Sequence, residues 1–142
     1  MSITGANAIY TIAIPGLFPI PQQLQGFAAD DVFDTDTLES VETLMGVDGN
    51  LSAGFVFVPV KQGISIQADS ISGAIFDQWY AAQQAIQDTY SAIGIIIQPT
   101  LGLKFALSNG YLTSYKPVAD TKKLIQPRKF GITWNSISPA SI

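Results

Sequence analysis

The stretch FALSNGYLTSYKP, residues 105–117, decides the fold class. Its centre, Asn109-Gly110, tolerates positive φ at both central positions of a type I′ turn, so we expect a β-hairpin there. Apolar residues alternate along both strands of this hairpin, but Ala106 and Leu112 occupy intervening positions, so neither face is cleanly polar. The pattern therefore predicts β-strands that require cover on both faces.

The composition points to cover supplied by other subunits. Of the 142 residues, 47% are apolar and only 13% are charged, about half the charged share of an ordinary soluble domain. The longest apolar region, 91–107, is interrupted by Gln98, Pro99 and Lys104, which argues against a membrane-spanning helix. Residues 1–21 lack a basic start and contain three prolines, so we expect no signal peptide. We therefore expect a single domain over residues 1–142, an obligate homo-oligomer, and no membrane insertion by this chain.

Several kinds of chemistry are excluded by what the chain lacks. It contains no cysteine and no histidine, which removes disulfides, imidazole or thiolate nucleophiles, and nearly all zinc sites. The glycines between 46 and 54 are not followed by the Lys-Ser/Thr pair of a phosphate-binding loop. Asp34 and Asp36 could do acid–base work, but nothing near them in sequence could tune or orient them. We expect no enzyme activity and no catalytic, cofactor-binding or metal-binding residues.

The chain reads as strands on either side of one helix. The hairpin predicted at 37–60 turns at Val47-Asp48-Gly49, although a helix over 37–45 is the alternative, because its apolar residues also fit a period of 3.6. The predicted elements are strands at 8–14, 24–34, 37–47, 51–60, 63–70, 91–98, 103–109, 110–117 and 128–136, a proline-punctuated connector at 15–23, and a helix at about 71–88. This order predicts a mainly β fold, an antiparallel β-sandwich or partly closed barrel with one packed α-helix.

The two tryptophans are predicted to anchor the core. On the helix, an apolar stripe recurs at spacings of four, three and four and includes Trp79; Ser70 or Ser72 is expected to cap its start. On the last strand, Trp134 faces the same way as Phe130 and Ile132. Burial is the favoured role for Trp79 and Trp134, and the alternative is a carbohydrate-binding module in which either tryptophan, or the Tyr111/Tyr115 pair, stacks on a sugar. The helical stripe consists of Ile75, Trp79, Ala82 and Ile86.

Charge is scarce but segregated. Seven of the eleven acidic residues fall between 30 and 48, and all seven basic residues lie between 61 and 129, so residues 1–60 carry −7 and residues 61–142 carry +3. Opposite patches on identical subunits can meet in head-to-tail stacking, which offsets the self-repulsion of each patch. With one arginine, the basic segment is too weak for tight binding of nucleic acid, whereas an acidic surface would let DNA slide past.

Four short segments carry a family resemblance. They are ISIQADS (64–70), FDQWYAAQQ (76–84), ALSNGYLTSY (106–115) and KFGITWNSI (129–137). In this order they resemble the tail tube proteins of tailed bacteriophages, especially contractile-tailed ones, which are related to the tube protein of type VI secretion. The resemblance implies a structural virion protein of the tail, assembled in the host cytoplasm, whose hexameric rings stack into a DNA-ejection channel. Sheath, baseplate and terminator proteins are the implied partners, and DNA passes through the lumen without specific binding.

Three groups of residues receive roles on this basis. Lining of the lumen is expected of Asp34, Asp36, Glu39 and Glu42, and ring stacking of Val47, Asp48, Gly49, Asn50 and Leu51. A basic patch between subunits is expected of Lys122, Lys123, Arg128 and Lys129. A tube-initiator or tail-tip ring protein of the same fold is the alternative to the repeating subunit.

Overall fold

A computed structural model describes residues 8–28 and 32–140, and it confirms the mainly β, antiparallel class with one helix. The elements are β1 (Ile9–Ile14), β2 (Phe18–Gln23), β3 (Phe33–Thr35), β4 (Val41–Met45), β5 (Leu51–Phe55), β6 (Val60–Ile66), α1 (Gly73–Ile86), β7 (Ala92–Gln98), β8 (Leu103–Ser114) and β9 (Arg128–Ala140). Seven strands form one sheet in the order β2-β1-β7-β8-β9-β6-β3, and β4 and β5 pair only with each other. The seven-stranded sheet does not close, so the subunit is not a barrel by itself.

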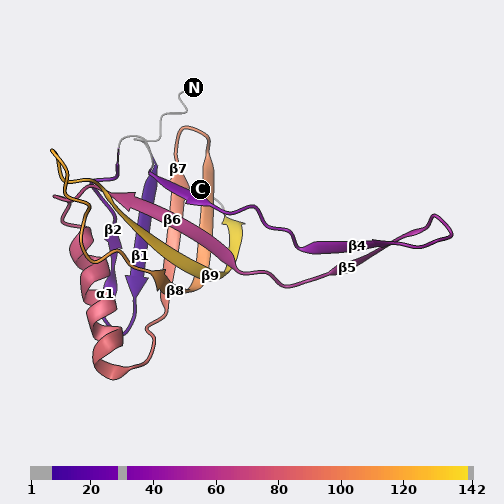
Figure 1. The fold of residues 1–142 in the computed structure, drawn as a ribbon, viewed down its shortest axis with the longest axis horizontal. Coiled ribbons are helices and arrows are strands. Elements are labelled where there is room, and N and C mark those ends of the chain that lie inside the picture. The colour runs from indigo at the N-terminus through magenta and orange to yellow at the C-terminus, as the bar shows by residue number, and fades with distance from the viewer. Residues whose placement is uncertain (1–7, 29–31, 141–142) are drawn as a thin grey trace.

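The sheet folds over on itself to make two layers. Strands β2, β1 and β7 form the first layer, β3 and β6 form the second, and the long strands β8 and β9 belong to both. Figure 1 shows β6 and β9 running obliquely across β1 and β7. The core lies between the layers, so the outer side of the first layer and the outer side of the second layer face opposite directions.

Asn109-Gly110 does not form the hairpin predicted for it. Strand β8 continues through this dipeptide without reversing direction. Two of its residues, Ser108 and Asn109, form a bulge opposite Ile93 of β7. Asn109 has the expected positive φ of 49°, but it is used to bend β8 at the corner between the two layers. Gly110 is required by packing: a Cβ atom there would lie 2.6 Å from Cζ3 of Trp134.

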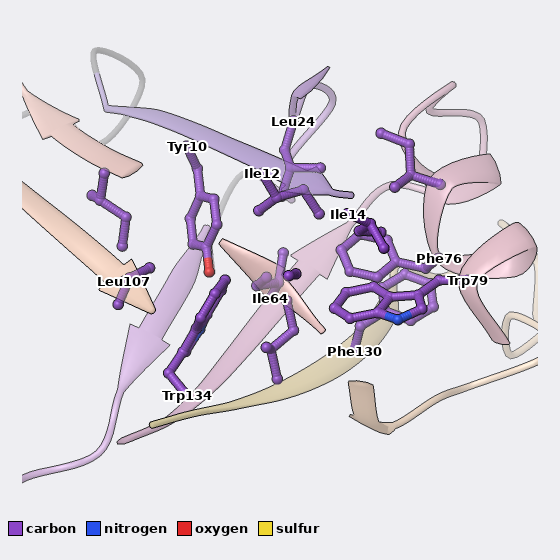
Figure 2. Packing of buried hydrophobic residues seen from close by; sticks show 14 of the residues in the cluster. Tyr10, Ile12, Ile14, Leu24, Ile64, Phe76, Trp79, Leu107, Phe130 and Trp134 are labelled. Carbon is purple, nitrogen blue, oxygen red and sulfur yellow. The ribbon is translucent and has the colours of Figure 1, made fainter. Parts of the chain in front are cut away.

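Two tryptophans anchor the core at its two ends (Figure 2). Between the layers, the buried amide oxygen of Gln62 accepts hydrogen bonds from the Tyr10 hydroxyl at 2.5 Å and from Trp134 Nε1 at 3.0 Å. On α1, Trp79 is fully buried and donates a hydrogen bond from Nε1 to the carbonyl oxygen of Tyr90 at 3.0 Å. Burial also raises the pKa of the Tyr10 phenol far above its usual range. Both layers are therefore joined by apolar contact and by a satisfied polar network.

The helix is shorter than expected and is capped differently. Ser72 occupies the N-cap position, but its backbone is helical and its side chain makes no capping hydrogen bond. Its hydroxyl oxygen instead accepts a hydrogen bond from the backbone N–H of Gln25 at 2.7 Å. Ile75, Phe76 and Trp79 are buried, whereas Ile86 is exposed, so only the first part of the predicted stripe packs on the sheet.

The early strands also differ from the prediction. Residues 15–23 are not a connector, because they contain β2, which pairs with β1. Its residues Pro19 and Pro21 lack backbone N–H groups, and they are tolerated because β2 is an edge strand. In the stretch 24–34, predicted as one strand, Leu24 donates a backbone hydrogen bond to the Tyr10 carbonyl of β1 at 2.8 Å, and pairing with β6 follows through a bridge between Phe27 and Ile66 and through β3.

The hairpin predicted between 37 and 60 is present, and the helical alternative for 37–45 is excluded. Strands β4 and β5 pair in register from Val41–Phe55 to Met45–Leu51, with Gly49 at φ 84° in the turn. The second strand ends at Phe55, and Val60 already belongs to β6. We call this hairpin, residues 41–55, the arm, and we call the seven-stranded sheet together with α1 the body. Figure 1 shows the arm extending away from the body on the side opposite α1.

Candidate functional site

The arm has no packed core. Every residue of β4 and β5 is exposed. Since paired residues share one face of a hairpin, Val41, Met45, Leu51 and Phe55 lie together on one face, and Glu42 and Leu44 lie on the other. The exposed fractions are 56% for Val41, 62% for Met45, 61% for Leu51 and 67% for Phe55. The arm thus presents an apolar face that the described part of the chain leaves exposed.

The tip of the arm is a well-defined turn. Val47, Asp48, Gly49, Asn50 and Leu51, the predicted stacking residues, all lie at or beside this tip. The Asp48 carboxylate accepts hydrogen bonds from the backbone N–H of Asn50 at 3.1 Å and from its side-chain amide at 2.8 Å. The backbone hydrogen bond from Asn50 is the main reason why the pKa of Asp48 lies below its usual value. The tip therefore keeps a negative charge at neutral pH.

The four predicted lumen carboxylates occupy two separate places. Asp34 lies on the outer side of β3, where Oδ1 accepts a hydrogen bond from Gly63 N at 3.1 Å and Oδ2 is 3.8 Å from Lys129 Nζ. Asp36 and Lys61 line the same shallow pocket, of about 290 Å³. Glu39 lies in the exposed connection to the arm and Glu42 lies on the arm itself. We call the outer side of β3, β6 and the first part of β9 the polar outer face.

The predicted basic patch is also divided. Lys122 and Lys123 are exposed in the loop before β9, while Lys129 lies on the polar outer face beside Asp34. Arg128 is engaged inside the subunit, where its Nη2 lies 2.5 Å from Asp77 Oδ1 on α1 and its Nε donates to the Lys116 carbonyl at 3.1 Å. The oppositely charged groups thus meet partly within one subunit.

The Arg128–Asp77 pair fastens the helix to the sheet. The guanidinium lies 4.9 Å from the Phe130 ring centroid and 5.7 Å from that of Tyr115, and the Tyr115 hydroxyl donates a hydrogen bond to Asp77. Hydrogen bonds from Arg128 hold the pKa of Asp77 below its usual value, and those to Asp77 raise the pKa of Arg128. Burial, followed by the hydrogen bond to Asp77, raises the pKa of Tyr115. The cluster is consistent with a structural role.

The outer side of the first layer, on β1 and β7, is apolar. Ile93 and Ile95 of β7 point outward and are 52% and 39% exposed. They pair with Ala13 and Thr11 of β1, and Ile95 also pairs with Ala106 of β8. These five residues, called the apolar outer face below, line a shallow groove of about 250 Å³.

Neither tryptophan is available to a ligand. Trp79 and Trp134 are both 0% exposed, so neither offers the stacking platform of a carbohydrate-binding module. Within residues 8–28 and 32–140, no three His, Cys, Asp or Glu side chains gather as a metal site would require. In the same part of the chain, no helix has the length and apolar character needed to cross a bilayer.

Sequence comparison assigns the chain to a family. The family model described as "Tail fiber protein gp32" matches residues 1–138. The chain belongs to the tail fiber protein gp32 family. A search of curated protein sequences finds no match to this gp32-family chain.

Solved structures share the fold of this gp32-family chain. A chain in the anti-feeding prophage baseplate structure aligns with a TM-score of 0.60 at 12% identity, covering 95% of this chain and 93% of that one. A chain in the anti-feeding prophage tube-terminating cap aligns at 0.62 and 12% identity, covering 100% and 93%. A chain in the sheath–tube complex of the extracellular contractile injection system PVC aligns at 0.61 and 11% identity, covering 100% and 92%. At these identities the likeness establishes a common fold.

The apolar outer face of the gp32-family chain was not predicted from the sequence. The apolar run AIGIII, residues 92–97, predicts a strand, but it does not by itself show which residues face the core and which face outward. In the structure Ala92 and Ile96 enter the core, whereas Ile93 and Ile95 form the apolar outer face. The signal was available: a run that is apolar at successive positions predicts a strand with both faces covered.

Proposed function

We propose that this chain is the repeating subunit of a tail tube, in which hexameric rings stack around a DNA-ejection channel. Support comes from a fold that matches a chain of a sheath–tube complex over the full length, and from membership in a family described as a tail protein. A six-fold symmetrised baseplate among the matching structures supports the hexamer. The role is structural and not enzymatic, the location is the virion tail after assembly in the host cytoplasm, and the partners are sheath, baseplate and terminator proteins.

The single observation that carries the proposal is the arm. An isolated two-stranded hairpin is marginally stable in water, and this one exposes large apolar side chains along one face. Contact with an adjacent ring would cover that face and order the arm. In this arrangement Val47, Asp48, Gly49, Asn50 and Leu51 are the stacking residues. Lys122 and Lys123 remain proposed contacts between subunits.

We place the polar outer face toward the channel. On this face Asp34 and Asp36 are accompanied by Lys61 and Lys129, so its charge is nearly balanced. Negative charge facing DNA would then come chiefly from Glu39 and Glu42. Because the Debye length is about 8 Å at physiological salt, these carboxylates would act at contact distance, as a surface to which phosphates do not adhere.

The second candidate is a ring that occurs once, at the tail tip or at the tube end. The specific observation in its favour is that chains of a baseplate and of a tube-terminating cap match as well as a chain of the sheath–tube complex does. Imaging of the purified protein by negative-stain electron microscopy separates the two roles. Long tubes with a central hole support the repeating subunit, single rings support the second candidate, and a dispersed monomer contradicts both.

The decisive variant is deletion of residues 47–52. Because residues 47–52 are all exposed, the deleted chain should keep the melting temperature of the parent and should no longer form tubes. Val118→Ser, at an apolar side chain that is 73% exposed in the loop after β8, serves as the control and should leave tubes intact. Long tubes from the deletion variant would show that the arm is not a stacking element.

The channel assignment has its own test. Changing Asp34, Asp36, Glu39 and Glu42 to Lys would replace a non-adhesive wall by one that releases counterions from DNA. Particles carrying this variant should assemble normal tails but eject DNA slowly, most severely at low salt, as measured by DNA release over time. Normal ejection through well-formed variant tubes would place these carboxylates outside the channel.

A further inference from the structure

Two apolar surfaces of this chain are left largely exposed by the described residues. One is the apolar outer face, where Ile93 and Ile95 stand beside Thr11, Ala13 and Ala106. The other is the apolar face of the arm, where two apolar pairs flank a small central pair. The pairs on this arm face are Val41–Phe55, Thr43–Ala53 and Met45–Leu51.

The arm does not cover the apolar outer face of its own subunit. Figure 1 shows the arm directed away from the body, while β1 and β7 lie within the body. All residues of β4 and β5 remain exposed, and so do Ile93 and Ile95. Residues 8–28 and 32–140 therefore leave both surfaces uncovered in the same molecule.

We propose that the apolar outer face of one copy binds the apolar face of the arm of a second copy. The two surfaces match in length, since the arm pairs five residues on each strand and the face is built on five consecutive pairs between β1 and β7. At about 3.3 Å per residue, each extends about 15 Å. They also match in relief, because the small Thr43–Ala53 pair lies between larger pairs, and the small side chains of Thr11, Ala13 and Ala106 leave a shallow groove beside Ile93 and Ile95.

Charge favours the same partner. The arm carries two acidic residues, Glu42 and Asp48, and no basic residue. Lys104 pairs with Ile97, next along the same outer side of the sheet after the Ile95–Ala106 pair. It is the one charged residue that borders the apolar outer face within the described part of the chain. Glu42 lies on the arm face opposite the apolar one, so it stays in water when the arm binds. Asp48, at the tip, is then the acidic group positioned to approach Lys104.

This contact joins two different surfaces of identical chains, so each copy can both donate an arm and receive one. The inference deepens the proposed function, because it names the surface that receives the arm. It also places the arm contact on the side of the subunit opposite the polar outer face, so an arm docked in this way carries Glu42 outside the channel and leaves Asp34, Asp36 and Glu39 as the proposed channel carboxylates.

The test uses cysteine cross-linking, for which the chain is well suited because it contains no cysteine. An Ala53→Cys variant carrying an affinity tag is mixed with an untagged Ile95→Cys variant under mild oxidation, and mixed disulfide dimers are followed by gel electrophoresis. The matched control is Ser52→Cys mixed with Ile95→Cys, because Ser52 lies next to Ala53 on the opposite face of the arm. We expect mixed dimers to form at least tenfold faster with Ala53→Cys. Equal rates, or no mixed dimer, would overturn the proposal.

A charge exchange gives a second measurement without altering the apolar residues. Lys104→Glu introduced into the Ile95→Cys chain should slow cross-linking severalfold, and Asp48→Lys in the Ala53→Cys chain should restore it. Failure of the second change to restore the rate would contradict the pairing of Asp48 with Lys104.

The cross-link also separates this inference from the tube proposal. If deletion of 47–52 abolishes tubes and no cross-link forms, the arm stacks elsewhere and only the docking site is wrong. If the cross-link forms in a protein that never makes tubes, the docking site stands and the tube proposal fails.

Discussion

The arm and the β6–β9 pair are both antiparallel ladders, yet they differ in everything that stabilises a ladder. Along β6 and β9, alternate residues such as Ile64, Phe130 and Trp134 are fully buried between two layers. Along β4 and β5, the same alternation of larger and smaller side chains leaves every residue exposed. Both ladders are held by antiparallel backbone hydrogen bonds, so the difference in their stability lies in the burial of apolar side chains, which is the dominant favourable term in folding.

The comparison shows that the chain divides its apolar residues between two tasks. Those of the body are buried when the subunit folds, whereas those of the arm stay exposed in the subunit and, in the proposed function, are covered by another copy. Mutations in the two regions should therefore separate cleanly into effects on folding and effects on association.

The largest effect is expected from Trp79→Ala. Removing a fully buried indole leaves a cavity beside Phe76 and should cost about 3–5 kcal/mol of unfolding free energy. Chemical denaturation followed by tryptophan fluorescence and circular dichroism measures it. Phe57→Ala, at a side chain 94% exposed beside the arm, is the matched control and should change little. A Trp79→Ala protein as stable as its parent would erase the contrast between the two regions.

A smaller effect is expected from Gly110→Ala. The added methyl group would overlap the Trp134 ring at the corner of β8, and overpacking of this kind costs about 1–3 kcal/mol. Gly54→Ala on the arm is the control, because a Cβ atom there meets nothing within 4 Å. Thermal unfolding of both variants would be compared with the parent. Equal melting temperatures for the two variants would show that the corner is not tightly packed.

The effect of Asp77→Asn should depend on pH. Arg128 holds the pKa of Asp77 below its usual value, so the ionised pair stabilises the fold at neutral pH, and this contribution is lost as pH falls through the lowered pKa. Because the Asp77 side chain is 44% exposed, the loss at pH 7 should be only about 1 kcal/mol. Melting curves at descending pH should show the gap between variant and parent narrowing below about pH 4. A gap that stays constant with pH would mean that the charge of Asp77 contributes nothing.

The smallest effect on folding is expected from Leu44→Ser on the arm. This side chain is 75% exposed, so the global unfolding free energy should move by no more than about 0.5 kcal/mol. Denaturant titration of the monomeric chain, at a concentration where no assembly occurs, is the measurement. A loss of several kcal/mol would mean that the arm packs on the body in solution.

Local sequence patterns predicted well the elements whose partners are near in the chain. The turn at Asp48-Gly49 and the first part of the helical stripe, through Ile75 and Trp79, are set by neighbouring residues. The lumen, stacking and inter-subunit roles assigned to surface residues remain predictions.

The errors concern residues whose role depends on distant partners. Asn109-Gly110 has the chemistry of a reverse turn, but the ring of Trp134 and the pairing of β8 with both neighbours make it a corner. Pro19 and Pro21 suggested a connector because proline is excluded from interior strands. Only the order of strands in the sheet shows that β2 is an edge strand, where proline is tolerated. Asp34 and Lys129, far apart in sequence, become neighbours on adjacent elements, so counting charges along the chain overstated their separation.

The prolines of β2 have a consequence for the subunit before it assembles. An edge strand offers unpaired N–H and C=O groups to any passing strand, and this is how many β proteins begin to aggregate. Without donors at Pro19 and Pro21, the edge of β2 is a poor template for such growth. Indiscriminate strand addition at this edge would then be suppressed, and any contact made there would depend on side chains.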